Sequence, residues 1–303
     1  MPLNITTGGM SARGFGFTTQ GYYNLNLTIT SNTSSYNVYS AATAAGWTGT
    51  NPLNLTLTIN SGVTVSGTGN GTSAAILLTS LFPKSIITIN NSGTVVGSGG
   101  AAGYNNNGGA AAIPYPGNPT SVIPINFPTG YNGTGYPTGP GAGGSTPGNN
   151  NYSGSGTGGP GSTGGSAIYL ASNVYLTINN STTGIMVGGG GGAGGQAGNN
   201  AGGGAGANGG YFIEETGSHF AVIGNNISGG VIASGGGASG GWGNRSTNDG
   251  IGGRPGYAAT NQYPGGSTGG NYGGNGSSPG LATNNTGTSL INTTGQFTLS
   301  PAA

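Results

Sequence analysis

Glycine supplies 73 of the 303 residues, and much of it is concentrated in long stretches. Residues 188–195 read GGGGGAGG, and residues 265–276 read GGSTGGNYGGNG, which approximates a repeated Gly-Gly-X triplet. Glycine has no side chain to bury, and fixing its backbone costs more conformational entropy than fixing that of any other residue. A chain of this kind therefore needs a source of order other than Leu, Ile and Phe packed between helices.

Charged residues make up only 2% of the chain, with a formal net charge of +1, whereas soluble domains typically contain about 25% charged residues. So few cations cannot form a basic patch, and we expect neither a nucleic-acid partner nor binding to an anionic membrane surface. No apolar run reaches the roughly 18 residues of a membrane span, so we expect no membrane insertion. The chain has no cysteine, which excludes disulfides and cysteine-ligated zinc.

The first residues, MPLNIT, have neither the basic region nor the apolar region of a secretory signal, so none is expected. A surface rich in Asn, Thr, Ser and Gly is nevertheless typical of extracellular proteins. A component of a virus particle, made in the host cytoplasm and released by lysis, would reconcile the two observations.

Short alternating apolar runs recur along the chain, each followed by Asn, a Gly or Thr turn and a second short run. Leu55–Val65 (LTLTINSGVTV) is the clearest copy. The alternation predicts strands with Leu, Ile and Val on one face and Thr on the other. Stacked copies would bury an apolar stripe and align their asparagines in ladders, as in a β-solenoid. The other copies are 25–29, 87–96, 174–187, 220–233 and 290–299.

Glycine-rich segments lie between these strand units, at residues 97–165, 188–210 and 235–280. Extended three-residue-per-turn helices of glycine can lie close together and hydrogen-bond backbone to backbone, as a polyglycine II bundle. The alternative is a flexible glycine loop. We expect an all-β, irregular fold that combines short β-solenoid-like strand units with a polyglycine II helix bundle and contains essentially no α-helix.

The composition changes where the glycine-rich segments turn back. Residues 113–137 and 242–264 are rich in Tyr, Pro and Asn, and such loops often form binding surfaces because aromatic rings offer contact area at low entropic cost. The alternative is that Tyr and Pro only stiffen the loop ends. The candidate receptor-binding residues are Tyr115, Phe127, Tyr131, Tyr136, Tyr152, Trp242, Arg245, Asp249, Arg254, Tyr257, Tyr263 and Tyr272.

Residues for catalysis are scarce. The one histidine, His219, lies near Glu214 and Glu215, but this cluster lacks a third metal ligand, and a charged turn is the preferred interpretation. Paired carboxylates for glycoside cleavage could come only from these two glutamates and Asp249. Glu214 and Glu215 are neighbours and would face opposite ways on a strand. We therefore expect no enzymatic activity, no catalytic residue, no metal and no cofactor.

Together these features resemble the glycine-rich receptor-recognition adhesins at the distal tips of tail fibres in T-even-like bacteriophages. The resemblance rests on glycine-rich stretches that alternate with aromatic, Asn-rich loops, and it covers roughly half of the chain. It implies a polyglycine II sandwich whose loops bind an outer-membrane protein or lipopolysaccharide of the host. The matching loops here are residues 110–138, 149–152, 199–200 and 242–263.

The resemblance also implies that an N-terminal portion docks to the fibre, which gives residues 1–50 an attachment role and leaves residues 51–303 as the scaffold. The function expected is therefore a tail-fibre or tail-tip receptor-binding adhesin, with host receptor and other virion subunits as partners. So few charges and such long glycine segments also favour a homo-oligomer. The alternatives are a structural virion protein (fibre, spike or capsid decoration), an ice-binding polyglycine II protein and a polysaccharide depolymerase.

Overall fold

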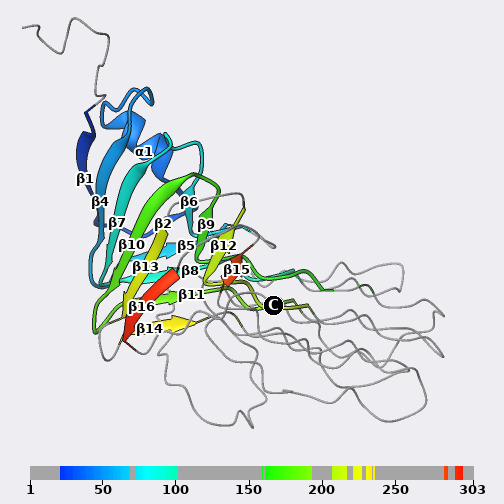
Figure 1. The fold of residues 1–303 in the computed structure, drawn as a ribbon. Helices are drawn as coiled ribbons and strands as arrows, with labels where there is room; N and C mark the ends of the chain where they lie inside the picture. Colours follow the sequence, from blue (N-terminus) through cyan, green and yellow to red (C-terminus); the bar gives the residue numbers. More distant parts are fainter. Residues whose placement is uncertain are drawn as a thin grey trace, which may run out of the picture.

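The computed structural model of the chain describes residues 21–68, 73–101, 159, 161–192, 207–216, 221–226, 230–233, 235, 283–285 and 291–295. In these residues the chain winds through five successive coils, each of which contributes one strand to each of three sheets, and the start of a sixth coil adds one more strand to sheet A (Figure 1). Sheet A contains the longest strands, which are β1 (Tyr23–Ile29), β4 (Leu53–Ile59), β7 (Ser85–Asn91), β10 (Val174–Asn180), β13 (Ala221–Asn226) and β16 (Ile291–Gly295).

The other two sheets consist of shorter strands. Sheet B contains β2 (Thr33–Ser34), β5 (Thr64–Ser66), β8 (Thr94–Val96), β11 (Ile185–Val187) and β14 (Val231–Ala233). Sheet C contains β3 (Tyr36–Asn37), β6 (Ile76–Leu78), β9 (Ile168–Leu170), β12 (Ile213–Glu215) and β15 (Thr283–Asn285). Sheets A and B correspond to the strand pairs that the sequence predicts, whereas the strands of sheet C are additional.

All strand pairs are parallel, and equivalent residues of successive coils lie side by side. In sheet A, for example, Leu27 pairs with Leu57, Leu57 with Ile89, and Ile89 with Ile178. The predicted solenoid-like stacking of strand units is consistent with this register. Because every coil repeats the register of its neighbour, a side chain that points inward in one coil points inward in the next.

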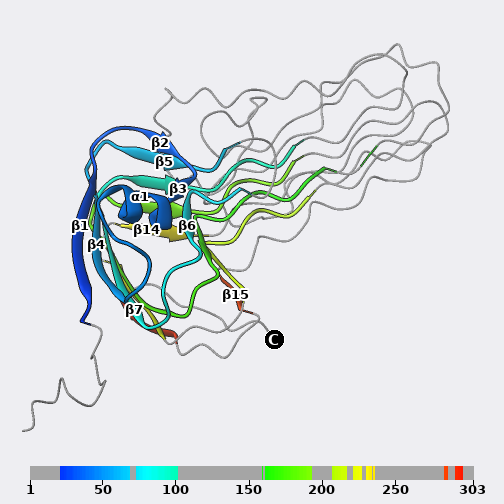
Figure 2. The same cartoon turned by 90° about the horizontal axis from the view of Figure 1, so that it is seen from above.

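The core lies between the three sheets, whose arrangement Figure 2 shows. It includes alternate apolar residues of β1 and of β4 to β12. Strand β4 shows the pattern: Leu55, Leu57 and Ile59 are fully buried, while Thr56 and Thr58 face outward and are partly exposed. Such burial removes apolar side chains from water at about 25 cal/mol per Å². The narrow core explains how a chain with so few large apolar residues builds an ordered scaffold.

Asparagine ladders form at the end of the long strands, as the sequence predicts. Asn91 Nδ2 donates to Asn180 Oδ1 at 2.8 Å inside the stack, where both side chains are buried. On the outer face, Asn179 Nδ2 donates to Asn90 Oδ1 at 2.9 Å. In-register stacking brings equivalent amides to hydrogen-bond distance. In the buried ladder, this bond gives a partner to amide groups whose burial without one would lower the stability of the fold.

One short helix, α1 (Val38–Ala44), is an exception to the all-β expectation, which the structure otherwise confirms. The preceding Asn37 caps it, because its Oδ1 accepts a hydrogen bond from Ser40 N at 3.0 Å. The helix buries Val38 and Ala42 in the core. Three alanines among its seven residues favour helix locally, and the helix contacts β3 and β6.

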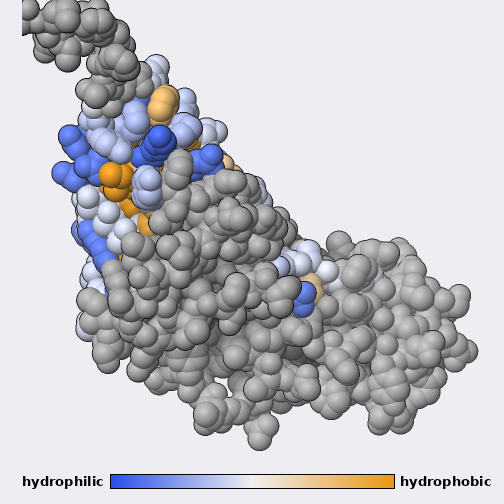
Figure 3. Space-filling model, in the orientation of Figure 1, coloured by the Kyte–Doolittle hydropathy of each residue, from blue (hydrophilic) through white to orange (hydrophobic). Residues whose placement is uncertain are grey.

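The first coil, β1 to α1, belongs to the same stack as the rest of the scaffold. Its inward-facing residues Leu25 and Leu27 are only partly buried, whereas their neighbours Leu55 and Leu57 in the second coil are fully buried. Figure 3 shows hydrophobic residues reaching the surface at this end of the molecule, among hydrophilic ones. Residues 1–20 lie outside the described part, and the attachment role of residues 1–50 stays a prediction.

Candidate functional site

The glycine-rich segments are all inserted at the same corner of successive coils, between the end of a sheet B strand and the start of a sheet C strand. The chain leaves this corner after β8, β11 and β14 and returns to it before β9, β12 and β15. The described ends of these segments are residues 97–101, 161–167, 188–192, 207–212 and 235, and we call them roots. Figure 2 shows the roots leaving the stack together on one side. Stacking therefore gathers at one corner three segments that are far apart in the sequence.

Backbone hydrogen bonds join the roots of these segments into one network. Four of these bonds form a series in which outgoing roots alternate with returning roots. The four bonds of this series join backbone groups that lie outside the assigned strands. The bonds run from Gly235 N to Gly210 O (2.8 Å), from Gly210 N to Gly189 O (2.7 Å), from Gly189 N to Gly165 O (2.8 Å), and from Gly165 N to Ser98 O (2.7 Å).

Glycine is required where these backbones approach one another. A Cβ on Gly189 would overlap the carbonyl oxygen of Ser98, and a Cβ on Gly210 would overlap that of Gly165. Side chains at these positions would push the neighbouring backbones apart and break the hydrogen bonds. The glycine content thus has a packing role at the roots, where the chain meets the stack.

The candidate receptor-binding residues all lie outside the described part of the chain. Tyr115, Phe127, Tyr131, Tyr136 and Tyr152 fall in residues 102–158. The others fall in residues 236–282; they are Trp242, Arg245, Asp249, Arg254, Tyr257, Tyr263 and Tyr272. Their receptor-binding role stays a prediction. The structure shows that the segments that carry them start from the same corner of the stack.

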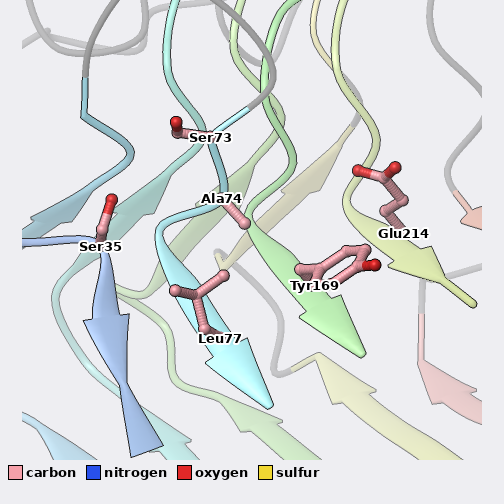
Figure 4. A pocket seen from close by; sticks show the side chains of 6 residues that line it. All are labelled: Ser35, Ser73, Ala74, Leu77, Tyr169 and Glu214. Carbon is pink, nitrogen blue, oxygen red and sulfur yellow. The ribbon is translucent and has the colours of Figure 1, made fainter. Parts of the chain in front are cut away.

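A groove of about 350 Å³ lies close to this corner, on the outer face of sheet C. Figure 4 shows Tyr169 on β9 between Leu77 on β6 and Glu214 on β12. The strand register places these three residues in one row, since Leu77 pairs with Tyr169 and Tyr169 with Glu214. Ser35, Ser73 and Ala74 line the rest of the groove.

The two neighbouring glutamates of β12 face opposite ways, as predicted. Glu215 is fully buried, whereas Glu214 is partly exposed and lines the groove. Their carboxylates therefore do not form a pair across one site. Within the described residues, no three His, Asp or Glu side chains converge on a point where they could hold a metal ion; His219 and Asp249 lie outside that part.

Neighbouring hydroxyl groups hold the polar atoms of the groove in place. Ser166 Oγ donates to Glu214 Oε2 at 2.8 Å, and Thr216 Oγ1 donates to the Tyr169 hydroxyl at 3.1 Å. An ionised carboxylate has further lone pairs available for a ligand beyond the one that Ser166 uses. The arrangement thus presents a fixed acceptor beside a partly exposed aromatic ring.

The sequence pattern did not predict Tyr169 and Leu77 as site residues. Both lie in three-residue strands, which are too short for a period-2 signal to be recognised. A usable signal did exist: a short apolar run immediately precedes the long strands β7, β10 and β13, in SAAILL (73–78), SAIYL (166–170) and YFIEE (211–215).

Residues 24–159 match the family model described as phage tail fibre adhesin Gp38. This similarity supports a phage tail-fibre adhesin. The matching region runs from β1 through β8 into the first long glycine-rich segment, so it includes the first coils of the stack and a segment that starts at the common corner. No curated protein and no solved structure shows significant similarity to the chain. Within the described residues, no helix has the length and apolar character that a membrane span requires.

Proposed function

We propose that this protein is the receptor-binding adhesin at the tip of a T-even-like phage tail fibre, and that its aromatic loops bind a host surface structure. The similarity of residues 24–159 to the adhesin family carries the proposal. The common corner of the glycine-rich segments adds support, because segments that start together can present their loops as one surface. The receptor is an outer-membrane protein or a surface polysaccharide.

The glycine-rich segments form a polyglycine II bundle in this proposal. The alternating hydrogen bonds between outgoing and returning roots, and the close approach at Gly189 and Gly210, are the contacts that such a bundle requires. A bundle of this kind would hold the loops rigidly, and rigidity lowers the ordering cost of binding.

Attachment to the virion takes place at the first coil in this proposal. Leu25 and Leu27 are partly buried there, although the equivalent positions one coil further are fully buried. A fibre subunit that covers this end would bury these side chains further and continue the stack, since terminal repeats of a solenoid need a cap. The protein is then located on the virion, after synthesis in the host cytoplasm.

The proposed role is non-enzymatic. Glu214 and Glu215 lie on opposite sides of sheet C, so they do not supply the facing carboxylates that glycoside cleavage uses. Recognition depends instead on aromatic stacking and on hydrogen bonds from Asn and backbone groups of the loops.

The test is binding of the purified, fluorescently labelled full chain to intact candidate host cells, in competition with whole phage. The adhesin should bind saturably and block infection, and the triple variant Trp242→Ala, Tyr257→Ala, Tyr263→Ala should lose binding. The matched control is Tyr22→Ala with Tyr175→Ala, which removes tyrosines that are 44% and 41% exposed on the scaffold. A folded protein that binds no host would overturn the adhesin role in favour of a structural virion protein. Equal losses in both variants would refute the loops as the site.

A further inference from the structure

The row formed by Leu77, Tyr169 and Glu214 combines three kinds of surface within two strand spacings. Neighbouring strands lie about 4.8 Å apart, so the row is roughly 10 Å long. It begins with an apolar side chain, continues with a partly exposed aromatic ring and ends with a carboxylate. The groove volume of about 350 Å³ falls at the lower end of the range for small-molecule sites, which is about 300–1,000 Å³.

This order of groups matches the chemistry of a sugar ring. A saccharide has C–H groups that stack on an aromatic face and hydroxyl groups that donate hydrogen bonds. Tyr169 supplies the ring, and Glu214 supplies an acceptor that forms charge-assisted bonds, which are stronger than neutral ones. The bonds from Ser166 and Thr216 hold both groups in place before a ligand arrives.

The charge of the groove selects among saccharides. Lys84 is the one cation in the described part of the chain, and it does not line the groove. An anionic sugar would bring its carboxylate near Glu214 with no described cation to compensate, and like charges repel. At the other end, Leu77 and Ala74 offer an apolar contact that fits the methyl group of a 6-deoxy or N-acetyl sugar.

We propose that the groove on the outer face of sheet C binds a neutral saccharide unit bearing a methyl group, stacked on Tyr169 and hydrogen-bonded to Glu214. The residues of this site belong to the solenoid, and none of them is a residue of the aromatic loops, so its test does not depend on the loops or on their receptor. A second, weaker contact on the flank would raise the overall affinity for a polysaccharide that both sites reach at once.

The experiment is saturation-transfer difference NMR on the full chain with methyl rhamnoside, methyl N-acetylglucosaminide and, as the anionic comparison, glucuronic acid. The neutral glycosides should give saturable signals, and glucuronic acid should give none. Glu214→Gln, which keeps the shape and removes the charge, should weaken binding by about tenfold. Tyr169→Ala should abolish it, and Tyr169→Phe, which keeps the ring, should stay within about twofold of the original affinity.

The matched control is Tyr175→Ala, at an exposed tyrosine on sheet A, which should leave saccharide binding unchanged. Thermal unfolding checks that each variant is folded, and if Tyr169→Ala is not, Glu214→Gln decides the question alone. The site is refuted by absence of signal from both neutral glycosides, by equal binding of glucuronic acid, or by signals that Glu214→Gln leaves intact. The triple loop variant should retain saccharide binding even where it no longer binds cells, which separates a failure of this site from a failure of the adhesin role.

Discussion

Asn91 and Asn180 lie one above the other at the corner between sheets A and B, and Asn91 Nδ2 donates to Asn180 Oδ1 at 2.8 Å. Asn91 Nδ2 also lies 3.2 Å from the Gly93 carbonyl, and Asn180 Nδ2 donates to the Gly184 carbonyl at 2.9 Å. The asparagines thus satisfy buried backbone groups of the turn between the two sheets as well as each other. Glycine follows each asparagine closely, and a Cβ on Gly184 would overlap Asn180 Oδ1.

Replacement of Asn180 by alanine should lower the free energy of unfolding by about 1–3 kcal/mol, because the change leaves buried partners without a hydrogen bond. Chemical denaturation of the full chain measures the loss. Asn179→Ala is the matched control, since Asn179 lies next to it on the outer face and pairs with Asn90. Asn179→Ala should lower the free energy of unfolding less than Asn180→Ala does. The reverse order would contradict the structural role of the buried ladder.

Replacement of Gly189 by alanine should destabilise the root network by about 1–3 kcal/mol, the usual cost of overpacking. The added methyl group would overlap the Ser98 carbonyl oxygen, and relief of this overlap lengthens the bonds to Gly165 and Gly210. Gly21→Ala is the control, because nothing lies within 4 Å of a Cβ at that position. It should change the unfolding free energy by less than about 0.5 kcal/mol. Equal stability of the two variants would show that the backbones are not held this close in solution.

Alkaline pH should destabilise the stack through Tyr36. Burial raises the pKa of Tyr36 above its usual value of 10.0. The folded state therefore holds the phenolic proton more tightly than the unfolded state, so this contribution to stability is complete below about pH 10 and is lost as pH rises through the folded pKa. Urea midpoints measured between pH 8 and pH 11 should fall more steeply for the original protein than for Tyr36→Phe. Parallel curves would assign the alkaline loss to other groups.

Replacement of Trp47 by alanine should cost about 3–5 kcal/mol, as expected for a large buried aromatic residue. The side chain is 2% exposed, donates from Nε1 to the Asn51 carbonyl at 3.0 Å, and meets Tyr39 edge-on at a centroid distance of 5.6 Å. Trp47→Phe should cost less, because it keeps a ring and loses only the hydrogen bond and some volume. Thermal unfolding followed by circular dichroism compares the stabilities of the two variants. Equal losses of stability would show that Trp47 stabilises the fold through its indole N–H hydrogen bond rather than through its ring.

The strands of sheet A could be predicted because their alternation is local, and most strands of sheet B because each follows such a run after Asn and a Gly or Thr turn. In β4, apolar and polar residues alternate over seven positions, and the strand bounds follow the alternation. The asparagine ladder was also predictable, since Asn recurs at the end of the repeated unit and parallel stacking brings equivalent positions together.

Helix α1 and the strands of sheet C could not be predicted in the same way. The helix has seven residues, a length that is marginal in isolation, and it is stabilised by the burial of Val38 and Ala42. Strands such as β6 and β9 have three residues and become strands because the coils above and below supply their hydrogen-bond partners. Neither kind of element carries a periodic pattern long enough to recognise.

The sequence by itself determined that the chain forms stacked strands with an apolar inside, and that its long glycine-rich segments contain few side chains with which to build a core. Only the tertiary structure decided that the glycine-rich segments start from one corner, and that Leu77, Tyr169 and Glu214 form one row. The physical reason is that alternation and backbone conformation depend on neighbours along the chain. A shared corner and a row across three strands depend on the register between coils, which is set by the core and by the buried asparagines.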